Sequence, residues 1–415
     1  MNYAQAIDRL FQTNSSSLNA RGSDDPLANA HALDRALSDP TSSYPTIHIA
    51  GSNGKGSVTT KIAKALEFSG YRVGVYTSPH LFSFRERIAI NGELISEEDV
   101  ARGLEKIYNL VDELNLSATF FEQATFLAFD YFRKKAVDVA VIETGLGGRW
   151  DATNVIHPEL TVITSISREH AQILGENTEQ IAAEKAGILK EKIPVVLGPK
   201  ARAQSIYNRA KELNCPVFAS KKISYFFDEE NTSIAQLVLQ QASAFNLKPE
   251  ALEKGLSFRP PCRFEKVGEA ILDVAHNPDA IFYLLQALHH FYPRRKFRFV
   301  VGFSKDKEYD VCLGLIADVA AHIHLVQAAS LRAATTDELQ NALKNEDPSL
   351  STSHSSIEEG VQLAYAEALA QGEILVICGS FYIMAEAKEA LGTGTQFPKD
   401  SLDLNAKILP SALSC

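Results

Sequence analysis

The chain has little cysteine, and the cysteines it has are scattered. Among 415 residues there are five, Cys215, Cys262, Cys312, Cys378 and Cys415, and none belongs to a Cys-x-x-Cys pair. An odd, dispersed set argues against a disulfide framework and against a zinc site built from paired thiolates. We therefore expect free thiols in a reducing compartment.

Long apolar runs and an excess of basic residues are also missing. No apolar stretch approaches the roughly 18 residues that a membrane span needs, and the N-terminus lacks the basic start and apolar run of an export signal. We expect a cytoplasmic protein without membrane attachment. The formal net charge of -10 argues against a nucleic-acid binder, which needs basic patches. It does not exclude a small anionic substrate held by a few local lysines and arginines.

The order of predicted elements indicates an α/β fold. Short β-branched runs predict strands, and the longer stretches between them carry apolar residues at helical spacing. Strands that alternate with helices favour parallel pairing, so we expect a doubly wound, mainly parallel sheet of the phosphate-loop type. The predicted strands are Thr46–Ala50, Arg72–Tyr76, Val137–Glu143, Leu160–Ser165 and Pro194–Leu197, and the predicted helices are Val58–Phe68, Ser96–Asn115, Thr125–Lys134, Thr178–Lys190 and Ala201–Glu212.

A proline-rich linker divides the chain, whose length already favours two domains. Arg259-Pro260-Pro261-Cys262 interrupts the alternation, because consecutive prolines cannot continue a helix. We expect one domain at residues 1–258, a linker at 259–263 and a smaller Rossmann-like α/β domain at 264–415. Residues 348–355 are expected to form a polar loop. The strands predicted for the second domain are Ala270–Val274, Lys296–Val301, His322–Val326 and Ile374–Cys378.

A glycine-rich segment after the first predicted strand has the features of a phosphate-binding loop. Gly51-Ser52-Asn53-Gly54-Lys55-Gly56-Ser57 stands between a strand and a helix. Glycines let backbone N–H groups converge on a phosphate, and the start of a helix adds a partial positive charge. Lys55 would reach the β and γ phosphates, and the Ser57 hydroxyl would serve phosphate or Mg²⁺. The pattern is a variant, since Gly56 separates the lysine from the serine.

Polar side chains follow three other predicted strands. Ser78 and His80 follow the second strand, Glu143 ends the third, and His170 follows the fourth. In open α/β sheets ligands collect at the carboxyl ends of strands, and Mg²⁺ takes only one or two protein carboxylates. Each residue alone has a structural alternative: a helix cap, a salt-bridged glutamate or a surface histidine. Together Ser78, Glu143 and His170 predict a metal site.

Two further segments are ambiguous when taken alone. Lys185 lies in a predicted helix and would ordinarily be a surface lysine. Asp273 and His276 end the first strand of the second domain, where Asp273 could bind a ribose hydroxyl. The alternative is a polar turn that caps the helix after Pro278.

In combination these segments resemble the folylpolyglutamate synthase/dihydrofolate synthase family, a branch of the Mur ligase superfamily. The matches cover nearly the whole chain, from about residue 30 to residue 385. In order they are Ala50–Ser57, Thr77–His80, Arg85–Ile88, Thr119–Glu122, Glu143–Asn154, Thr164–His170, Glu184–Lys190, Arg263–Phe264, Leu272–Pro278, Ser304–Lys307 and Gly379–Tyr382.

The resemblance implies a role for particular residues. Lys55, Lys185 and His170 would be catalytic, and Lys185 matches a lysine that CO₂ carbamylates into a carboxylate near the metal. Mg²⁺ would be held by Ser57, Ser78, Glu143 and His170. ATP would be bound by Gly54, Lys55, Gly56, Ser57, Asn231, Arg263, Asp273 and His276. The pterin would contact Leu33, Thr119, Phe120, Phe121, Trp150, Asp151 and Ala152.

The implied function is an ATP-dependent ligase that activates a carboxylate as an acyl phosphate. It would join L-glutamate to 7,8-dihydropteroate and to the γ-carboxyl group of reduced folates, as a monomer. Two alternatives remain open. A Mur-type peptide ligase of cell-wall synthesis usually carries an additional N-terminal domain, whereas only some 45 residues precede the first strand here. A nucleotide-dependent switch or binding protein would explain the phosphate loop but not Asp273 or the predicted metal residues.

Overall fold

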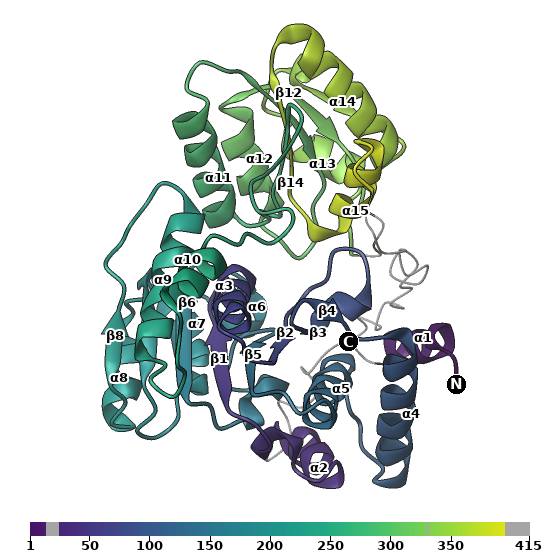
Figure 1. Cartoon of the computed structure of the whole chain (residues 1–415). Coiled ribbons are helices and arrows are strands. Elements are labelled where there is room, and N and C mark those ends of the chain that lie inside the picture. The colour runs from purple at the N-terminus through teal and green to yellow at the C-terminus, as the bar shows by residue number, and fades with distance from the viewer. Residues whose placement is uncertain (14–24, 329, 331, 395–415) are drawn as a thin grey trace.

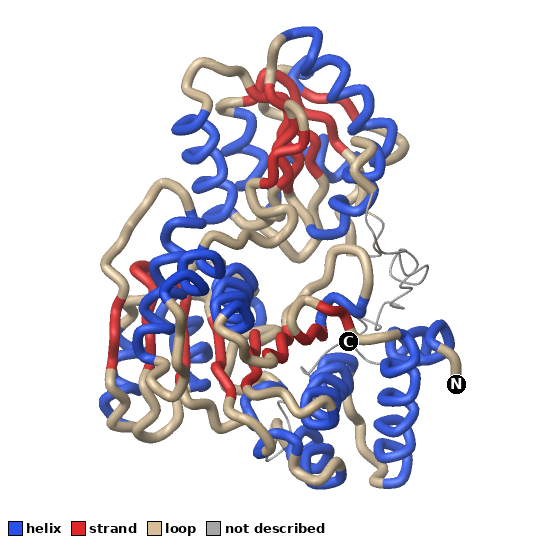
Figure 2. The backbone as a smooth tube through the Cα atoms, in the orientation of Figure 1, coloured by secondary structure: helices blue, strands red, loops and turns tan. Residues whose placement is uncertain are grey.

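The chain folds into two α/β units, each built on its own sheet (Figure 1). The computed structural model describes residues 1–13, 25–328, 330 and 332–394. Figure 2 shows the strands gathered into two groups, one in each half of the molecule. Within the described residues, no helix combines the length and the apolar character that crossing a membrane requires.

The first sheet has eight strands in the order β4-β3-β2-β5-β1-β6-β7-β8. Pairing is parallel from β2 to β8, and β3 and β4 add an antiparallel edge. This confirms the predicted mainly parallel, doubly wound sheet. The strands are β1 (Thr46–Ala50), β2 (Val73–Tyr76), β3 (Ile88–Ile90), β4 (Glu93–Leu94), β5 (Val139–Glu143), β6 (Leu160–Ser165), β7 (Val195–Lys200) and β8 (Val217–Ala219).

Helices cover both faces of this sheet. Alternate residues of the central strands point to opposite faces, as Ile47 and Ile49 do on one face and His48 on the other. One face packs on α3 (Lys55–Phe68), α9 (Phe227–Gln241) and α10 (Pro249–Leu256). The other packs on α1 (Tyr3–Gln12), α2 (Ala28–Ala36), α4 (Glu97–Glu113), α5 (Phe120–Lys134), α7 (Thr178–Lys185) and α8 (Gln204–Glu212), and a short α6 (Ala171–Leu174) precedes α7.

The second sheet has six strands in the order β13-β12-β11-β14-β10-β9, parallel except for the β9–β10 pair. They are β9 (Glu265–Val267), β10 (Ala270–Leu272), β11 (Phe297–Val301), β12 (Ala320–Leu325), β13 (Ser351–Ser353) and β14 (Ile374–Cys378). One face packs on α11 (Pro278–Phe291), α12 (Tyr309–Ala317) and α13 (Thr336–Ala342), and the other on α14 (Ile357–Gln371) and α15 (Met384–Ala390).

Several local predictions differ from the structure. Residues 348–355 are not only a loop, because Ser351–Ser353 pair with β12 as an edge strand. This strand is rich in serine and threonine and lacks the apolar residues by which a strand is recognised. The short strands β3, β4, β8 and β9 were also not predicted. The predicted helix at residues 178–190 ends at Lys185, where a 3₁₀ turn at Ala186–Ile188 replaces it.

The cysteines that the structure describes agree with the prediction of free thiols. Cys215, Cys262, Cys312 and Cys378 are unpaired and buried, and Cys415 lies outside the described residues. Burial raises the pKa of the Cys262 thiol to about 12, with the nearby Glu265 carboxylate acting in the same direction. The thiolate that would react as a nucleophile is therefore strongly disfavoured at neutral pH.

A buried lysine holds the connection between the two sheets. Lys61, in α3, is fully buried and donates hydrogen bonds to the carbonyl oxygens of Leu256, at 2.7 Å, and Phe258, at 2.9 Å. Its ammonium also lies 3.0 Å from the Asp228 carboxylate. The chain that leaves α10 toward residues 259–263 is thereby fixed to the core of the first unit.

The stability of the first unit should depend on the protonation of His48. This side chain is fully buried in β1, its Nε2 lies 2.8 Å from Thr153 Oγ1, and burial lowers its pKa to about 3. Unfolded histidine has a pKa of about 6.5. Below that pH the unfolded state binds a proton that the folded state does not, so stability is lost as pH falls from about 6.5 toward 3. The expected slope is about 1.4 kcal/mol per pH unit.

Urea unfolding between pH 4 and 7, followed by the fluorescence of Trp150, measures this slope. Trp150 is the only tryptophan of the chain and lies in the first unit. His48→Gln should flatten the dependence by the contribution of one proton. His157→Gln, which changes an exposed histidine of the same unit, should leave it unaltered. Equal slopes for His48→Gln and the wild type would refute the assignment.

Candidate active site

The polar residues predicted from separate strands converge at one edge of the first sheet. Strands β2, β5, β1 and β6 are adjacent and parallel, so their carboxyl ends lie side by side. Ser78, Glu143, the phosphate loop and His170 stand at or just beyond these ends, and all of them line one cavity of about 400 Å³. This is the place where open α/β sheets bind ligands.

Two glycines give the phosphate loop its conformation. Gly51 and Gly54 have φ angles of 151° and 90°, and a Cβ at these positions would lie 1.9 Å from Thr164 Oγ1 and 2.3 Å from Asn231 Oδ1. Neither position accepts a side chain. Helix α3 begins directly after Gly54, so its free N–H groups face the cavity.

Lys55 lies folded over this loop. Its Nζ donates to the carbonyl oxygen of Gly51 at 2.9 Å and is 3.4 Å from that of Ser52. The following residue, Gly56, stands close to Glu143: a Cβ there would lie 3.4 Å from the Glu143 Oε2 atom. The glycine that makes the loop a variant therefore lies next to the strand-end carboxylate.

Glu143 is a buried carboxylate among cations. Its Oε2 accepts a hydrogen bond from the Ser78 backbone N–H at 3.3 Å. Burial raises its pKa to about 7, while Lys55, Arg263 and Arg87 act in the opposite direction. A carboxylate with one long hydrogen bond retains lone pairs for a divalent cation, and Mg²⁺ needs only one such ligand with a hydroxyl and water. Within the described residues, no three His, Cys, Asp or Glu side chains form a metal cluster.

Lys185 is buried, so it is not the surface lysine that its segment alone would suggest. Only 1% of its surface is exposed, and its Nζ donates to the carbonyl oxygen of Gly51 at 3.0 Å and to Glu169 Oε1 at 2.7 Å. Desolvation lowers the pKa of Lys185, opposed by the Glu169 carboxylate. Lys55 and Lys185 thus share the carbonyl oxygen of Gly51. Sequence reasoning did not single out Glu169, although it stands beside His170.

His170 connects the two units. Its backbone has a φ of 45°, an uncommon conformation for a residue other than glycine, and its Nε2 accepts a hydrogen bond from Lys307 Nζ at 2.9 Å. Burial lowers the pKa of His170 to about 4, with the Lys307 ammonium acting in the same direction. The imidazole is therefore neutral at physiological pH, and its single lone pair, on Nε2, accepts the hydrogen bond from Lys307; a metal ion could be bound at Nε2 only in place of Lys307.

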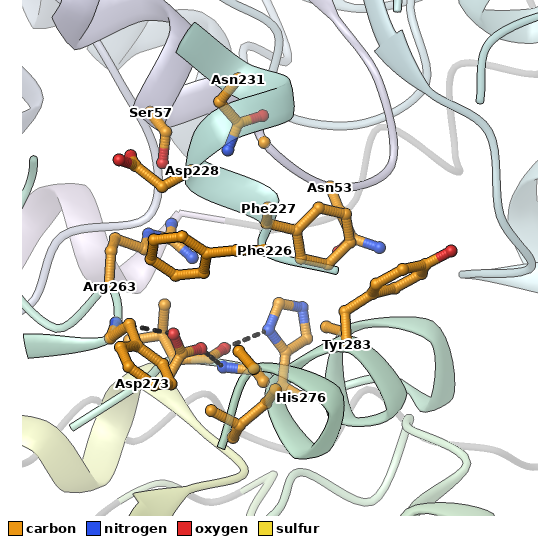
Figure 3. Close-up of a pocket in the computed structure, with 17 residues that line it drawn as sticks. Asn53, Ser57, Phe226, Phe227, Asp228, Asn231, Arg263, Asp273, His276 and Tyr283 are labelled. Atoms are coloured by element: carbon orange, nitrogen blue, oxygen red, sulfur yellow. Dashed lines mark hydrogen bonds between the residues drawn. The ribbon is translucent and has the colours of Figure 1, made fainter. Parts of the chain in front are cut away.

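A smaller cavity of about 70 Å³ adjoins the phosphate loop and is lined by most of the predicted nucleotide contacts, from both units; Lys55 and Gly56 line the large cavity instead (Figure 3). Asn231 and Ser57 lie on one side of it, and Asp273 and His276 lie on the other. Asp273 accepts hydrogen bonds from the backbone N–H groups of Phe264 and Ala275, both at 2.8 Å.

Aromatic side chains cross this smaller cavity between its two polar sides (Figure 3). Phe226 and Phe227 come from the first unit, and the Tyr283 ring of the second unit lies 4.7 Å from that of Phe227. Arg263 is partly buried here between Cys262 and Phe264, whose φ angles are 53° and 50°. These aromatic residues were missed because an aromatic at helical spacing is usually part of a core.

The large cavity also contains most of the predicted pterin segments. Thr119, Phe120 and Phe121 line it at the start of α5, and Trp150, Asp151 and Ala152 line it on the segment after β5. The buried Asp151 carboxylate accepts hydrogen bonds from the backbone N–H groups of Gly145 and Leu146, both at 2.9 Å, and so shapes that segment. Trp150 remains 42% exposed.

Leu33 is not brought to this cavity. Its side chain is fully buried in the core between α2 and its neighbours, and Pro26 and Leu27 line the cavity instead. From the second unit, Ser304, Asp306, Lys307, Arg332 and residues 379–382 complete the lining.

Comparison with protein families gives two matches along the chain. Residues 49–236 match the Mur ligase middle domain, and residues 262–381 match the Mur ligase glutamate ligase domain. A dihydrofolate synthase/folylpolyglutamate synthase of Buchnera aphidicola is 34% identical to the chain, over 81% of this chain and 87% of the relative.

Solved structures with the same fold include nucleotide complexes. Escherichia coli FolC in complex with DHPP and ADP has a TM-score of 0.82 at 26% identity, covering 94% of this chain and 98% of that one. The bifunctional synthase of Yersinia pestis complexed with AMPPNP and Mn ion has a TM-score of 0.81 at 28% identity, with the same coverage.

Cation binding at Glu143 should release a proton near neutral pH. Because the pKa of Glu143 is about 7, the carboxyl group is about half protonated at that pH. A divalent cation selects the charged form, so its affinity should fall about tenfold per pH unit below 7. Calorimetric titration of Mg²⁺ into the nucleotide-free protein, in two buffers of different protonation enthalpy, counts the released protons. We expect about half a proton per cation at pH 7.

Glu143→Gln should abolish both the release and its pH dependence. Glu93→Gln, an exposed glutamate of the same unit, serves as the matched control and should behave like the wild type. If Glu143→Gln releases the same fraction of a proton as the wild type, the titrating group is elsewhere.

Proposed function

Because the chain belongs to the dihydrofolate synthase/folylpolyglutamate synthase family of Mur ligases, we propose that it joins L-glutamate to 7,8-dihydropteroate and to reduced folates. It is an ATP-dependent ligase. The observation that carries the proposal is the convergence of Lys55, Glu143 and Lys185 at one end of a cavity whose other wall belongs to the second unit. A phosphate donor and an acyl acceptor can meet there.

ATP would place its phosphates on the loop and its nucleoside end in the smaller cavity. Gly54, Gly56 and Ser57 would receive the phosphates at the start of α3, where N–H groups and the helix dipole favour negative charge. At the nucleoside end we assign Asn231, Arg263, Asp273 and His276, which line or border the smaller cavity.

The first step would be phosphoryl transfer. A substrate carboxylate attacks the γ-phosphate in line, an acyl phosphate forms, and ADP leaves with the electron pair of the broken P–O bond. Lys55 would leave the Gly51 carbonyl oxygen and offset charge on the transferring group, since this chemistry depends on positioning and electrostatics. Mg²⁺ bound by Ser57, Ser78, Glu143 and His170 would supply further charge neutralisation.

Lys185 has the properties of a lysine that CO₂ can carbamylate. Only a neutral amine attacks CO₂, and burial together with the neighbouring Lys55 ammonium lowers the pKa of Lys185. A carbamate at this position would replace a positive charge by a negative one beside Glu169. With ATP and Mg²⁺ bound, Mg²⁺ would then be needed to balance the negative charges of the carbamate and of Glu169.

The pterin would occupy the apolar part of the large cavity. Phe120, Phe121, Ala152 and the exposed indole of Trp150 offer apolar surface, while Thr119 and Asp151 are polar. The benzoate or glutamate carboxylate at the other end of the substrate would then extend toward Lys55. Leu33, as a core residue, is assigned no direct contact.

Amide formation completes the reaction. The amine of L-glutamate attacks the acyl phosphate carbon, and phosphate leaves from the tetrahedral intermediate. Closing of the domains, at residues 1–258 and 264–415 about the linker 259–263, would keep water away from the acyl phosphate. We propose a cytoplasmic monomer that performs both glutamate additions in one site.

Replacement of Lys55 tests the reaction. ADP release is measured with dihydropteroate and with reduced folates, in each case with and without L-glutamate. Lys55→Ala should lower kcat by about 10²–10³-fold with either acceptor, because one charge that stabilises the transferring group is lost. Lys64→Ala is the control: Lys64 lies in the same helix but pairs with Glu67 at 2.7 Å, and its loss should leave kcat unchanged.

The same assay separates the alternatives. A binding or switch protein would show no turnover that depends on an acceptor, and a cell-wall peptide ligase would not use a pteroate. Full activity of Lys55→Ala would remove the phosphate loop from the mechanism.

Trp150 should report pterin binding directly. As the chain's single tryptophan, at the rim of the large cavity, it should change its fluorescence when dihydropteroate binds. Trp150→Ala should raise KM for dihydropteroate by about fivefold to tenfold, the contribution of one aromatic stack, with kcat little changed. Trp150→Phe, which keeps a ring, should retain most of the affinity. An unchanged KM in Trp150→Ala would place the pterin elsewhere.

A further inference from the structure

One small network of hydrogen bonds connects the phosphate loop to the second unit. Asn53 Nδ2 donates to Asp279 Oδ2 at 2.9 Å and lies 3.4 Å from Asn277 Oδ1. In return, Asn277 Nδ2 donates to Asn53 Oδ1 at 3.0 Å. The residues come from opposite units, so this three-residue contact, Asn53 with Asn277 and Asp279, closes the seam at the tip of the loop. We call it the amide contact.

On the loop side, Asn53 is fixed by its own backbone. Its N–H donates to Ser165 Oγ at 2.9 Å, and its carbonyl oxygen accepts from Thr164 Oγ1 at 2.7 Å and from Ser165 Oγ at 3.0 Å. Gly54, with a φ of 90°, follows immediately and precedes the first residue of α3. The direction of the Asn53 side chain is therefore set by the conformation of the phosphate loop.

On the other side, the partners belong to the start of α11. Asn277 caps this helix, with its Oδ1 accepting from the Ala280 N–H at 2.8 Å, and only 4% of its surface is exposed. Asp279 lies in the first turn. Burial raises the pKa of its carboxyl group, and the hydrogen bond from Asn53 opposes this. Asp273 and His276 follow β10, the strand before α11, and both line the smaller cavity.

From this geometry we propose that the amide contact couples the conformation of the phosphate loop to the seating of the second unit over the cavity. Asn53 is a positioning residue in this scheme. When the loop adopts the conformation seen here, Asn53 holds α11, and with it Asp273 and His276, against the nucleotide site. When the loop changes, this hydrogen-bonded contact between the units is lost.

The inference rests on the proposed function and adds a consequence to it. An acyl phosphate in a site that is not closed reacts with water, which returns the carboxylate and releases phosphate. Loss of the amide contact therefore produces futile ATP consumption as well as a slower ligase. A purely structural role for Asn53 would slow the reaction without changing its stoichiometry.

The measurement is the number of ADP molecules released per amide bond formed, with L-glutamate present. Wild-type enzyme should give one. Asn53→Ala and Asp279→Ala should each raise the ratio to about two or more, and the double variant should be no worse than either single one, because both remove the same contact. Asp279→Asn keeps an acceptor oxygen for Asn53 and should restore a ratio near one.

A second contact between the units provides the control. Arg168 and Glu308 form an exposed pair across the seam, with 3.7 Å between their charged atoms. Glu308→Gln loosens the seam without touching the phosphate loop and should leave the ratio at one. If it raises the ratio as much as Asp279→Ala does, the effect belongs to the seam in general and the proposal is wrong.

Two other outcomes overturn the proposal. If Asn53→Ala raises the number of ADP molecules released per amide bond but Asp279→Ala does not, Asn53 acts on the substrate alone. A ratio of one in both variants would mean that the contact does not guard the acyl phosphate. The melting temperature of each variant shows whether it is folded.

A measurement of the shape of the protein, which needs no enzymatic turnover, separates this proposal from the proposed function. Small-angle scattering with a non-hydrolysable ATP analogue should show a smaller radius of gyration for the wild type than for Asn53→Ala and Asp279→Ala. If the wild type forms no amide with any pteroate or folate, the proposed function fails. The scattering comparison then still decides the coupling, and equal radii would reject it.

Discussion

Two ammonium groups converge on a single carbonyl oxygen, that of Gly51, and the rest of the site is arranged around this fact. Lys55 and Lys185 would repel each other strongly in a buried place unless anions stood nearby. Glu169 pairs with Lys185 at 2.7 Å, and Glu143 ends the adjacent strand. The positive charges at this carbonyl oxygen therefore have negative partners within the protein. Lys55 and Lys185 already bond to protein oxygens, so an anionic substrate must compete with these oxygens for the two lysines.

The division into two sheets explains how one site can carry out both phosphoryl transfer and amide formation. The first sheet supplies the loop, the strand-end carboxylate and the buried lysine. The second sheet contributes Asp273, His276 and Lys307 from its own strand ends. Because the carboxyl ends of both parallel sheets face the same cleft, phosphate chemistry and amine attack can take place a short distance apart. Neither sheet alone encloses the reacting atoms.

Much of this arrangement could be predicted from sequence, because it depends on local patterns. Strands Thr46–Ala50, Leu160–Ser165 and Ile374–Cys378 have the predicted bounds, since each is a short run rich in β-branched residues that is followed by glycine or polar residues. Lys55, Glu143 and Asp273 stood at strand ends, where position alone suggests a role. Short strands such as Ser351–Ser353 could not be predicted, because tertiary pairing rather than composition makes them strands.

Other features depended on contacts that no single segment contains. Lys185 pairs with Glu169, which lies in another segment. His170 is bonded to Lys307, which is more than a hundred residues away in sequence. Leu33 was assigned to the pterin from the family resemblance, but its side chain is buried in the core. A sequence motif shows which residue types stand at a position, whereas burial and bonding partners in the fold determine the charge of a side chain and whether it faces the cavity.

Helix α3 also has a mechanical consequence. Its first residue is Lys55, and six residues later Lys61 grips the carbonyl oxygens of Leu256 and Phe258, where the chain leaves for the second unit. At a rise of about 1.5 Å per residue, Lys55, which would contact phosphate, and Lys61, which holds the start of the linker, are only about 9 Å apart along one helix. A displacement of the first turn of α3 would therefore be transmitted to the start of the linker without an intervening loop.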